Sequence, residues 1–322
     1  MRKRTFNISD IHHSKSAASF AAFIFMLFCV QIVAFSQTKK GFSFKFNPTN
    51  DAISYSIDTK IIRDKSVDTQ KRVDVIDLKT QASIKKEPFG YLMNLKPQIL
   101  SLKRDGIDTI DPLLSIMYEG DFSFILNSKG ELDSVTGFDN VENQIKNSFP
   151  PEYHQAMSKI ITTDVLENSA VENWFSAISG YLGSTVSIND EFSTINEYPL
   201  PSGEALTYFT IASIYGEVEC DEHNCLEIHY RYTSNPDDVN RVEELLEDFL
   251  AEMGEETEEF ISNMKFSGTN ISGNGVIIID PTTMLIYKEH YSKTIKMKIS
   301  IPGFEKDVES VSITTIDSIY SY

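Results

Sequence analysis

The chain has 322 residues, with 47 acidic and 29 basic side chains, and a formal net charge of −18 at pH 7. Hydrophobic residues make up 41% of it, including 21 Phe and 14 Tyr, which is enough for a folded core. So acidic a chain repels nucleic acid and anionic membrane surfaces, because both recruit clusters of Lys and Arg. Nucleic-acid binding is the function excluded most firmly.

Residues 1–36 have the three parts of a secretory signal peptide. Basic residues at positions 2–4 precede an uncharged apolar run from Ala17 to Phe35, and Ala34 and Ser36 supply the small residues before a cleavage site. We expect cleavage before Gln37, which leaves 37–322 as a single exported domain in the periplasm or at the cell exterior, with no stable membrane span. The alternative is an uncleaved anchor, since the apolar run is nearly long enough to cross a bilayer.

Residues 41–137 are predicted to form strands. Apolar and polar residues alternate in Ile53–Ile57 and in Val73–Ile76, which is the pattern of a half-buried strand. Two further strands, Phe122–Leu126 and Glu131–Thr136, flank the turn residues Asn127–Gly130 and predict a hairpin.

The spacing of the apolar residues changes from that of a strand to that of a helix in the middle of the chain, at about 139–182. Val141, Ile145 and Phe149 are spaced four apart, as on one face of a helix. Trp174 and Leu182 fit a further short helix. Strands return between Ala205 and Thr233.

Cys220 and Cys225 are the cysteines that remain after cleavage, and we predict a disulfide between them. They flank the polar loop Asp221–Asn224 between two predicted strands, at the end of a hairpin. An exported protein folds in an oxidising compartment, where two nearby cysteines form a disulfide by default. The alternative is a metal site formed by both thiols, His223 and an acid, which an oxidising compartment disfavours. No other metal and no cofactor is expected.

The last third is predicted to contain one helix and then strands. Asn235 and Pro236 open a helix with an apolar face from Val239 to Met253. The acids of Glu243–Glu259 are interpreted as its solvated face, with binding of divalent cations or of a basic partner as the alternative. Ser267–Gly275 is interpreted as a loop, and loops often border binding sites. Residues 276–297 and 308–319 complete the β-rich section, with a turn at 281–283.

Strand blocks on either side of a helical block predict an α+β fold: a large, curved antiparallel β-sheet with helices packed across one face. Two segments resemble each other, Phe124–Leu132 and Ile277–Leu285, each an apolar strand, an Asn or Asp turn and a second strand. They indicate either two similar β-rich halves around the helical middle or two ordinary hairpins, because turn chemistry is generic.

Catalytic motifs are missing from the sequence. There is no Gly-x-Ser-x-Gly, no His-Glu-x-x-His and no phosphate-binding glycine loop, and His154, His223, His229 and His290 are each isolated. Asp105–Asp111 differs from a calcium loop because its acids are three apart, so a turn is expected. We therefore predict no catalytic and no metal-binding residue, and favour a protein without enzymatic activity over an enzyme, a question that the sequence leaves open.

The leader ending at Ser36, the hairpin Phe122–Gly137 and the pattern Gly275–Asp280 resemble an exported family of unknown function from Bacteroidota. This resemblance implies a Gram-negative envelope and no activity. More loosely, a curved sheet with covering helices resembles the lipoprotein-carrier half-barrel, which shelters acyl chains. No functional residue can be matched between this chain and those carriers.

Three functions remain open. The first is a non-catalytic envelope protein that binds an apolar, lipid-like or amphipathic ligand in its curved sheet. The second is an interaction protein whose acidic surface binds an envelope or cell-surface partner. The third is a hydrolase whose site is assembled from residues remote in sequence, which requires histidine, carboxylate and hydroxyl groups to converge.

Overall fold

The structure is a computed structural model that describes residues 40–48, 51–67, 70–151, 154, 162–174, 182–199, 205–221, 223–235, 265–300 and 308–322. The predicted signal peptide, the predicted helix after Pro236 and the acidic segment Glu243–Glu259 lie outside these residues. Every element below belongs to one compact unit, Gly41–Tyr322.

Most of the described residues lie in strands, many of which are longer than the five or six residues typical of globular proteins. The strands are β1 (Gly41–Ser43), β2 (Ala52–Val67), β3 (Gln70–Glu87), β4 (Gly90–Arg104), β5 (Ile107–Asp108), β6 (Phe122–Asn127), β7 (Leu132–Thr136), β8 (Thr185–Ser187), β9 (Glu191–Pro199), β10 (Ala205–Cys220), β11 (His223–Ser234), β12 (Lys265–Ile279), β13 (Ile286–Ser300) and β14 (Val308–Ser321).

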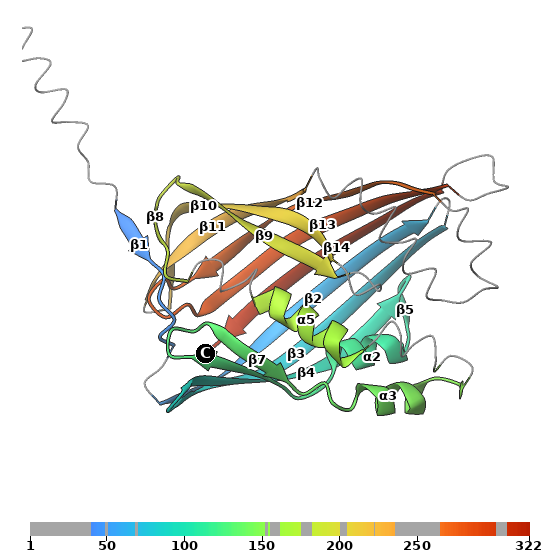
Figure 1. The fold of residues 1–322 in the computed structure, drawn as a ribbon, viewed down its shortest axis with the longest axis horizontal. Helices are drawn as coiled ribbons and strands as arrows, with labels where there is room; N and C mark the ends of the chain where they lie inside the picture. Colours follow the sequence, from blue (N-terminus) through green and yellow to red (C-terminus); the bar gives the residue numbers. More distant parts are fainter. Residues whose placement is uncertain are drawn as a thin grey trace, which may run out of the picture. The chain divides into compact units, whose positions relative to one another are not determined.

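The predicted large antiparallel sheet is confirmed (Figure 1). Its order is β7-β6-β4-β3-β2-β14-β13-β12-β11-β10-β9, with β5 added beside β4, and every neighbouring pair is antiparallel. The strands before the helical middle form one side and those after it form the other. The two sides join where the last strand, β14, pairs with β2. A small second sheet pairs β1 with β8.

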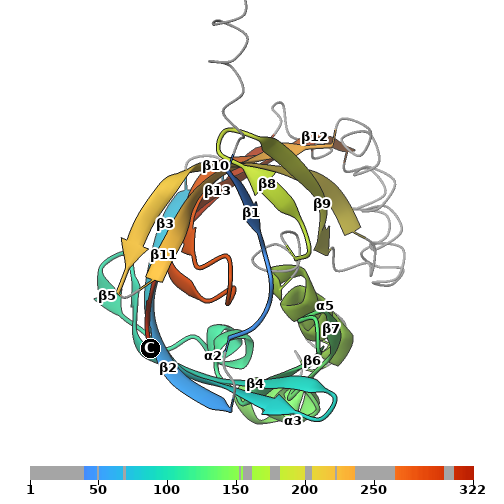
Figure 2. The same cartoon turned by 90° about the vertical axis from the view of Figure 1, so that its left-hand side faces the viewer.

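This sheet curves, as Figure 2 shows from β4 through β2 and β11 to β9. Register shifts interrupt the pairing between Asp77 and Leu78, between Ile214 and Gly216, and between Ile278 and Ile279. An extra residue in one strand bends that strand and increases its twist, so these irregularities favour the curve.

Helices do not pack across one face as predicted. The helices among the described residues are short: α2 (Pro112–Tyr118), α3 (Val141–Ser148) and α5 (Thr163–Trp174). α2 lies against β4, and α5 contacts β7 and β9. The predicted apolar spacing in α3 is correct, since Val141 and Ile145 are buried, but eight residues cannot form a covering layer.

The structure tests two of the predictions made for the last third of the chain. Ser267–Gly275 is not a loop: it lies inside β12, between β11 and β13. Its Gly, Ser and Asn content is typical of connectors, but Gly275 serves a packing role described below. The predicted turn at 281–283 is confirmed, because β12 ends at Ile279 and β13 begins at Ile286.

Candidate functional site

The inner face of the curved sheet lines a cavity of about 380 Å³. Cavities of this size are at the small end of those that hold ligands. The lining comes from strands on both sides of the sheet, from the ends of α2 and α5, and from the segment after β1. Most of its side chains are apolar or aromatic: Phe46, Tyr55, Ile57, Ile61, Leu78, Ile84, Met93, Leu95, Tyr118, Phe124, Trp174, Tyr208, Tyr230, Tyr232, Ile277, Met284, Leu285, Ile286, Tyr291, Ile316, Tyr320 and Tyr322, with Thr59, Thr210, Glu289, Lys293 and Ser318 as polar members.

Strand alternation puts these side chains on one face, because residues two apart in a strand point the same way. In β13 the inward series is Tyr287, Glu289, Tyr291 and Lys293. Glu289, Tyr291 and Lys293 line the cavity, whereas the intervening Lys288, His290 and Ser292 belong to the opposite face.

The cavity is basic at one end. Lys293 pairs in register with Thr314, and Thr314 pairs with Arg63, so the two cations lie in one line across three strands. The Lys293 Nζ atom lies 4.1 Å from the ring centroid of Tyr208 and 5.3 Å from that of Tyr232. Both rings contact the ammonium group by cation–π attraction.

Arg63 lies on the same face of the sheet and contacts α2. Its guanidinium donates to the hydroxyl of Tyr118, the last residue of α2, and lies 5.2 Å from the centroid of that ring. Lys65 is two residues further along β2 and shares the face of Arg63. Partial loss of water lowers the pKa of Lys65, and the nearby Arg63 and Arg72 lower it further.

A buried ion cluster lies beside these cations. Asp74 is 1% exposed and accepts from Arg72 Nη2 at 2.6 Å and from Arg104 Nε at 2.9 Å. Arg104 also donates to Asp111, whose carboxylate caps α2 through the N–H groups of residues 113 and 114. Burial raises the pKa of Asp74 and Asp111, but the arginine hydrogen bonds outweigh it, and both pKa values are lowered. Two acids and two arginines balance, so this cluster is neutral as a whole.

Glu289 lies further along the cavity, in register with Ser318 of β14 and Ile277 of β12. The Tyr230 hydroxyl reaches its Oε1 atom at 3.4 Å from β11, across the intervening strand β12. Gly275 makes this possible: a Cβ at that position would lie 2.4 Å from Cζ of Tyr230. Burial raises the pKa of Glu289 to about 7, which the Tyr230 hydrogen bond only partly offsets.

The phenols around Glu289 remain neutral. Burial raises the pKa of Tyr291 and Tyr320, and the Glu289 charge raises both further. Burial also raises the pKa of Tyr232, and its neighbours Tyr291 and Glu289 raise it further. These hydroxyls are therefore hydrogen-bonding groups without charge over the physiological pH range.

The other end of the cavity is aromatic. Phe46 packs edge-on against Tyr91, with ring centroids 5.2 Å apart, and against Trp174 at 5.8 Å. Gly130, with φ of +85°, gives Phe46 its space, because a Cβ there would lie 2.3 Å from Cβ of Phe46. Trp174 Nε1 is buried, and it has no hydrogen-bond partner among the described residues.

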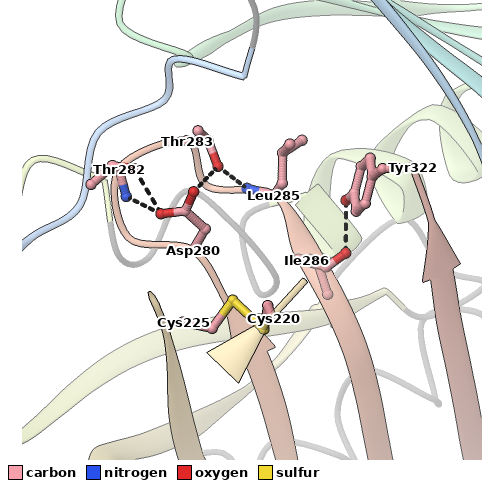
Figure 3. Close-up of a disulfide and its surroundings, with 8 residues drawn as sticks. All are labelled: Cys220, Cys225, Asp280, Thr282, Thr283, Leu285, Ile286 and Tyr322. Atoms are coloured by element: carbon pink, nitrogen blue, oxygen red, sulfur yellow. Dashed lines mark hydrogen bonds between the residues drawn. A yellow bond between two sulfur atoms is a disulfide. The ribbon is translucent and has the colours of Figure 1, made fainter. Parts of the chain in front are cut away.

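A rigid turn between β12 and β13 helps to form the aromatic end (Figure 3). Asp280 is 2% exposed and accepts from the backbone N–H and hydroxyl of Thr282 at 2.8 and 2.7 Å, and from the hydroxyl of Thr283 at 2.8 Å. Met284 and Leu285 follow, both buried and both lining the cavity. The segment after β1 is bonded to this turn, because Lys45 N–H donates to the carbonyl of Pro281 at 3.0 Å.

The predicted disulfide, Cys220–Cys225, lies near this turn (Figure 3). The two Cα atoms are 5.8 Å apart. The hairpin is tighter than the predicted four-residue loop, because Cys220 pairs in register with His223 and Val218 pairs with Cys225. The cysteines are therefore diagonal neighbours instead of facing each other directly. The alternative metal site has no support, since both thiols are used in the bridge.

Histidines do not contribute to the cavity lining among the described residues. His290 pairs with Asp317 at 2.5 Å and His229 pairs with Glu227 at 2.6 Å, and these four side chains are on the opposite face of the sheet or its solvent-accessible rim. His154 contacts the carbonyl of Phe149. The described residues thus do not bring histidine, carboxylate and hydroxyl together in the cavity, as the hydrolase hypothesis requires.

Neither a metal site nor a membrane-spanning helix is found in the described part of the chain. No cluster of three His, Cys, Asp or Glu side chains has the arrangement of a metal site there. Among the same residues, no helix is both long and apolar enough to cross a membrane.

The residues that shape the cavity were not identified from the sequence. The Tyr-x-Glu-x-Tyr-x-Lys series of β13 carried a usable signal, because strand alternation puts its members on one face. Asp111 followed by Pro112 was a second signal, since an Asp cap with Pro at the first position opens a helix, here α2. The predicted turn at Asp105 is correct: β4 and β5 are joined there, and Asp105 and Gly106 have positive φ.

Comparison with protein-family models and with curated proteins finds no match for this chain.

Proposed function

We propose that this protein binds an amphipathic, lipid-like small molecule in the cavity of its curved sheet and acts without catalysis. One observation carries the proposal: a cavity of about 380 Å³ whose lining is mainly aliphatic and aromatic, with a few polar groups at defined positions. Ligand sites have this composition, because apolar walls supply affinity and sparse polar groups fix orientation.

The proposed setting is the periplasm or the exterior of a Gram-negative cell. The Cys220–Cys225 disulfide supports it, since such bonds persist in oxidising compartments. The basic and apolar N-terminal pattern supports it independently. The resemblance to an exported Bacteroidota family agrees with this setting, and the looser resemblance to lipoprotein carriers agrees with a carrier role.

The test is saturable binding of a neutral apolar probe. Purified full-length protein is titrated with N-phenyl-1-naphthylamine, whose fluorescence rises in apolar surroundings, and hexadecanol is added as a competitor. We expect about one probe molecule per chain and displacement by hexadecanol. Native mass spectrometry of the same preparation is expected to show a co-purified small molecule.

Tryptophan variants test whether the probe binds in the cavity. Ile57 lines the cavity, so Ile57→Trp fills it and is expected to weaken binding roughly tenfold or more. Ile319 is on the neighbouring strand and 58% exposed, so Ile319→Trp is the matched control and should bind normally. Unfolding midpoints verify that both variants are folded. Leu95→Trp, which fills the cavity from β4, is a further variant expected to weaken binding. A folded wild type without saturable binding would overturn the proposal.

A further inference from the structure

Glu289 places a carboxyl group in the wall of a mainly apolar cavity. Among the described lining residues the other charged side chain is Lys293, about 13 Å further along the same strand. No ion pair between described residues includes Glu289, and its hydrogen-bond partner is the Tyr230 hydroxyl at 3.4 Å. A carboxyl group removed from water costs much less when it is protonated than when it is charged. The cavity wall therefore favours the neutral acid at this position.

Hydroxyl groups continue the polar surface from Glu289 across the sheet. Glu289 pairs in register with Ser318 of β14, and Ser318 pairs with Thr59 of β2. The Ser318 and Thr59 hydroxyl oxygens are 3.0 Å apart, and all three residues line the cavity. Directly opposite residues of antiparallel strands have Cβ atoms about 4.5–5.5 Å apart. The carboxyl group and the two hydroxyls therefore form one short polar row in the apolar wall.

From this arrangement we propose that protonated Glu289 is the polar anchor of the ligand, and that with Ser318 and Thr59 it binds a neutral hydroxyl or carbonyl group. This inference rests on the proposed function and adds the class of the ligand's polar group and a coupling of binding to protonation. A protonated carboxyl group and a hydroxyl each donate and accept hydrogen bonds, as a neutral polar group requires. A ligand that fills the cavity also removes water from Glu289, so it binds the protonated form more tightly.

The titratable groups around Glu289 include no second carboxylate and no histidine among the described lining residues. These lining groups are Tyr55 of β2, Tyr118 of α2, Tyr208 of β10, Tyr230 and Tyr232 of β11, Tyr291 and Lys293 of β13, Tyr320 of β14 and Tyr322 after it, with Arg63 and Tyr287 on the same face outside the lining. Burial raises the pKa of Glu289 to about 7. Burial also raises the pKa values of Tyr55, Tyr291 and Tyr320 above the ordinary phenol value of about 10. Glu289 therefore titrates near neutral pH and these phenols do not.

The first experiment measures binding against pH with ligands whose own charge is constant. Full-length protein is titrated with the neutral probe, and with hexadecanol as competitor, between about pH 6 and pH 8.5. Because a ligand that favours protonated Glu289 binds less tightly once that proton is lost, the affinity of the wild type for hexadecanol should fall roughly fivefold or more over this range.

Glu289→Gln keeps a donor and an acceptor but cannot ionise. Its affinity for hexadecanol should be independent of pH and close to that of the wild type at pH 6. Glu309→Gln is the matched control, because it makes the same change at an exposed position on the opposite face of β14. This control should keep the pH dependence of the wild type.

The second experiment distinguishes an anchor from a wall that is merely neutral. Glu289→Leu has no charge and no hydrogen-bonding group, so at pH 6 it should bind hexadecanol roughly tenfold more weakly than Glu289→Gln does. Ser318→Ala removes the neighbouring hydroxyl and should weaken hexadecanol binding roughly threefold. Unfolding midpoints verify that each variant is folded.

Several results would overturn this inference and leave the proposed function intact. They are a wild-type affinity that does not change with pH, the same pH dependence in Glu289→Gln, and equal binding of hexadecanol by Glu289→Leu and Glu289→Gln. Binding of hexadecyltrimethylammonium that strengthens as the pH rises would overturn it too, because an ionised Glu289 would then be pairing with a cation. Absence of all saturable binding would overturn the proposed function itself.

Discussion

Asp74 and Asp280 are buried acids at opposite ends of the cavity, and their partners differ. Asp74, 1% exposed, is held by the guanidinium groups of Arg72 and Arg104. Asp280, 2% exposed, is held by the backbone N–H and the hydroxyl of Thr282 and by the hydroxyl of Thr283. The basic end is thus organised by charge, and the aromatic end by neutral hydrogen bonds and apolar packing.

The two ends of the cavity therefore satisfy a buried acid by different chemistry. Neutral donors satisfy Asp280 at the aromatic end without placing a cation there. At the basic end two arginines satisfy Asp74, and Asp111 is the second acid that balances their charge. Polarity therefore changes along the sheet while the backbone pattern stays the same.

The largest expected effect is at the basic end. Asp74→Ala leaves Arg72 and Arg104 without their central acceptor, and removing one partner of a buried ion pair costs about 3–5 kcal/mol of unfolding free energy. Urea unfolding at pH 7 measures this loss. Asp133→Ala, at an exposed position on β7, is the control and should change stability by less than about 0.5 kcal/mol.

The cost of Asp74→Ala should depend on pH. The pKa of Asp74 is lowered in the folded state, so its contribution is present above the unfolded pKa of about 3.9 and is lost as the pH falls through the folded value. The gap between wild type and variant should narrow below about pH 4. A constant gap down to pH 2 would contradict the ion-pair explanation.

The aromatic end should show a smaller effect. Asp280→Ala removes three hydrogen bonds to Thr282 and Thr283 and frees the turn that carries Met284, for an expected loss of about 2–3 kcal/mol. Urea unfolding measures it, and Asp133→Ala is again the control. Neutral-probe binding should weaken in this variant, because Met284 and Leu285 line the cavity. Unchanged probe binding would show that the turn does not shape the cavity.

Between the two ends, Glu289 gives the opposite pH response to Asp74. The pKa of Glu289 is raised to about 7 in the folded protein, whereas a Glu in the unfolded chain has a pKa near 4.3. Between these two pH values the folded protein therefore binds a proton that the unfolded chain has lost. Stability from this group is present below about pH 4.3 and is lost as the pH rises through 7. Glu289→Gln should therefore stabilise the protein at pH 8 and have little effect at pH 4. Thermal unfolding across this pH range checks the sign.

The smallest effect is expected at Trp174. Trp174→Phe removes an Nε1–H donor that has no partner among the described residues, so no hydrogen bond is lost. The affinity for the neutral probe should change about twofold or less, compared with roughly tenfold for Ile57→Trp. Probe titration of both variants measures this difference. A loss for Trp174→Phe as large as that for Ile57→Trp would show that the Nε1–H group takes part in binding.

Local patterns in the sequence predicted the sheet because they are decided within a few residues. Alternation in Val73–Ile76 and the Asn127–Gly130 turn each specify their own strand or hairpin, and both are confirmed. Cys220 and Cys225 were predictable for the same reason: the hairpin between them is short, so their proximity needed no long-range information.

The cavity depends on contacts that no local pattern contains. Glu289 meets Tyr230 only because Gly275 separates them across a strand, and that glycine was read as part of a loop. Lys293 and Arg63 are 230 residues apart in the chain and become neighbours through Thr314. The order of the strands in the sheet decides which of these residues become neighbours. That strand order could not be deduced from one sequence.

The pairing of β14 with β2 sets a condition on the order of folding. Residues 310–321 join residues 56–67 at the centre of the sheet, so the seam between the two sides cannot form until nearly the whole polypeptide has been synthesised. Contacts of such long range fold slowly, because closing the intervening chain is entropically costly. A chain exported as proposed would profit from this delay, since translation and translocation would precede closure of the seam, and the ligand cavity would assemble only at the destination.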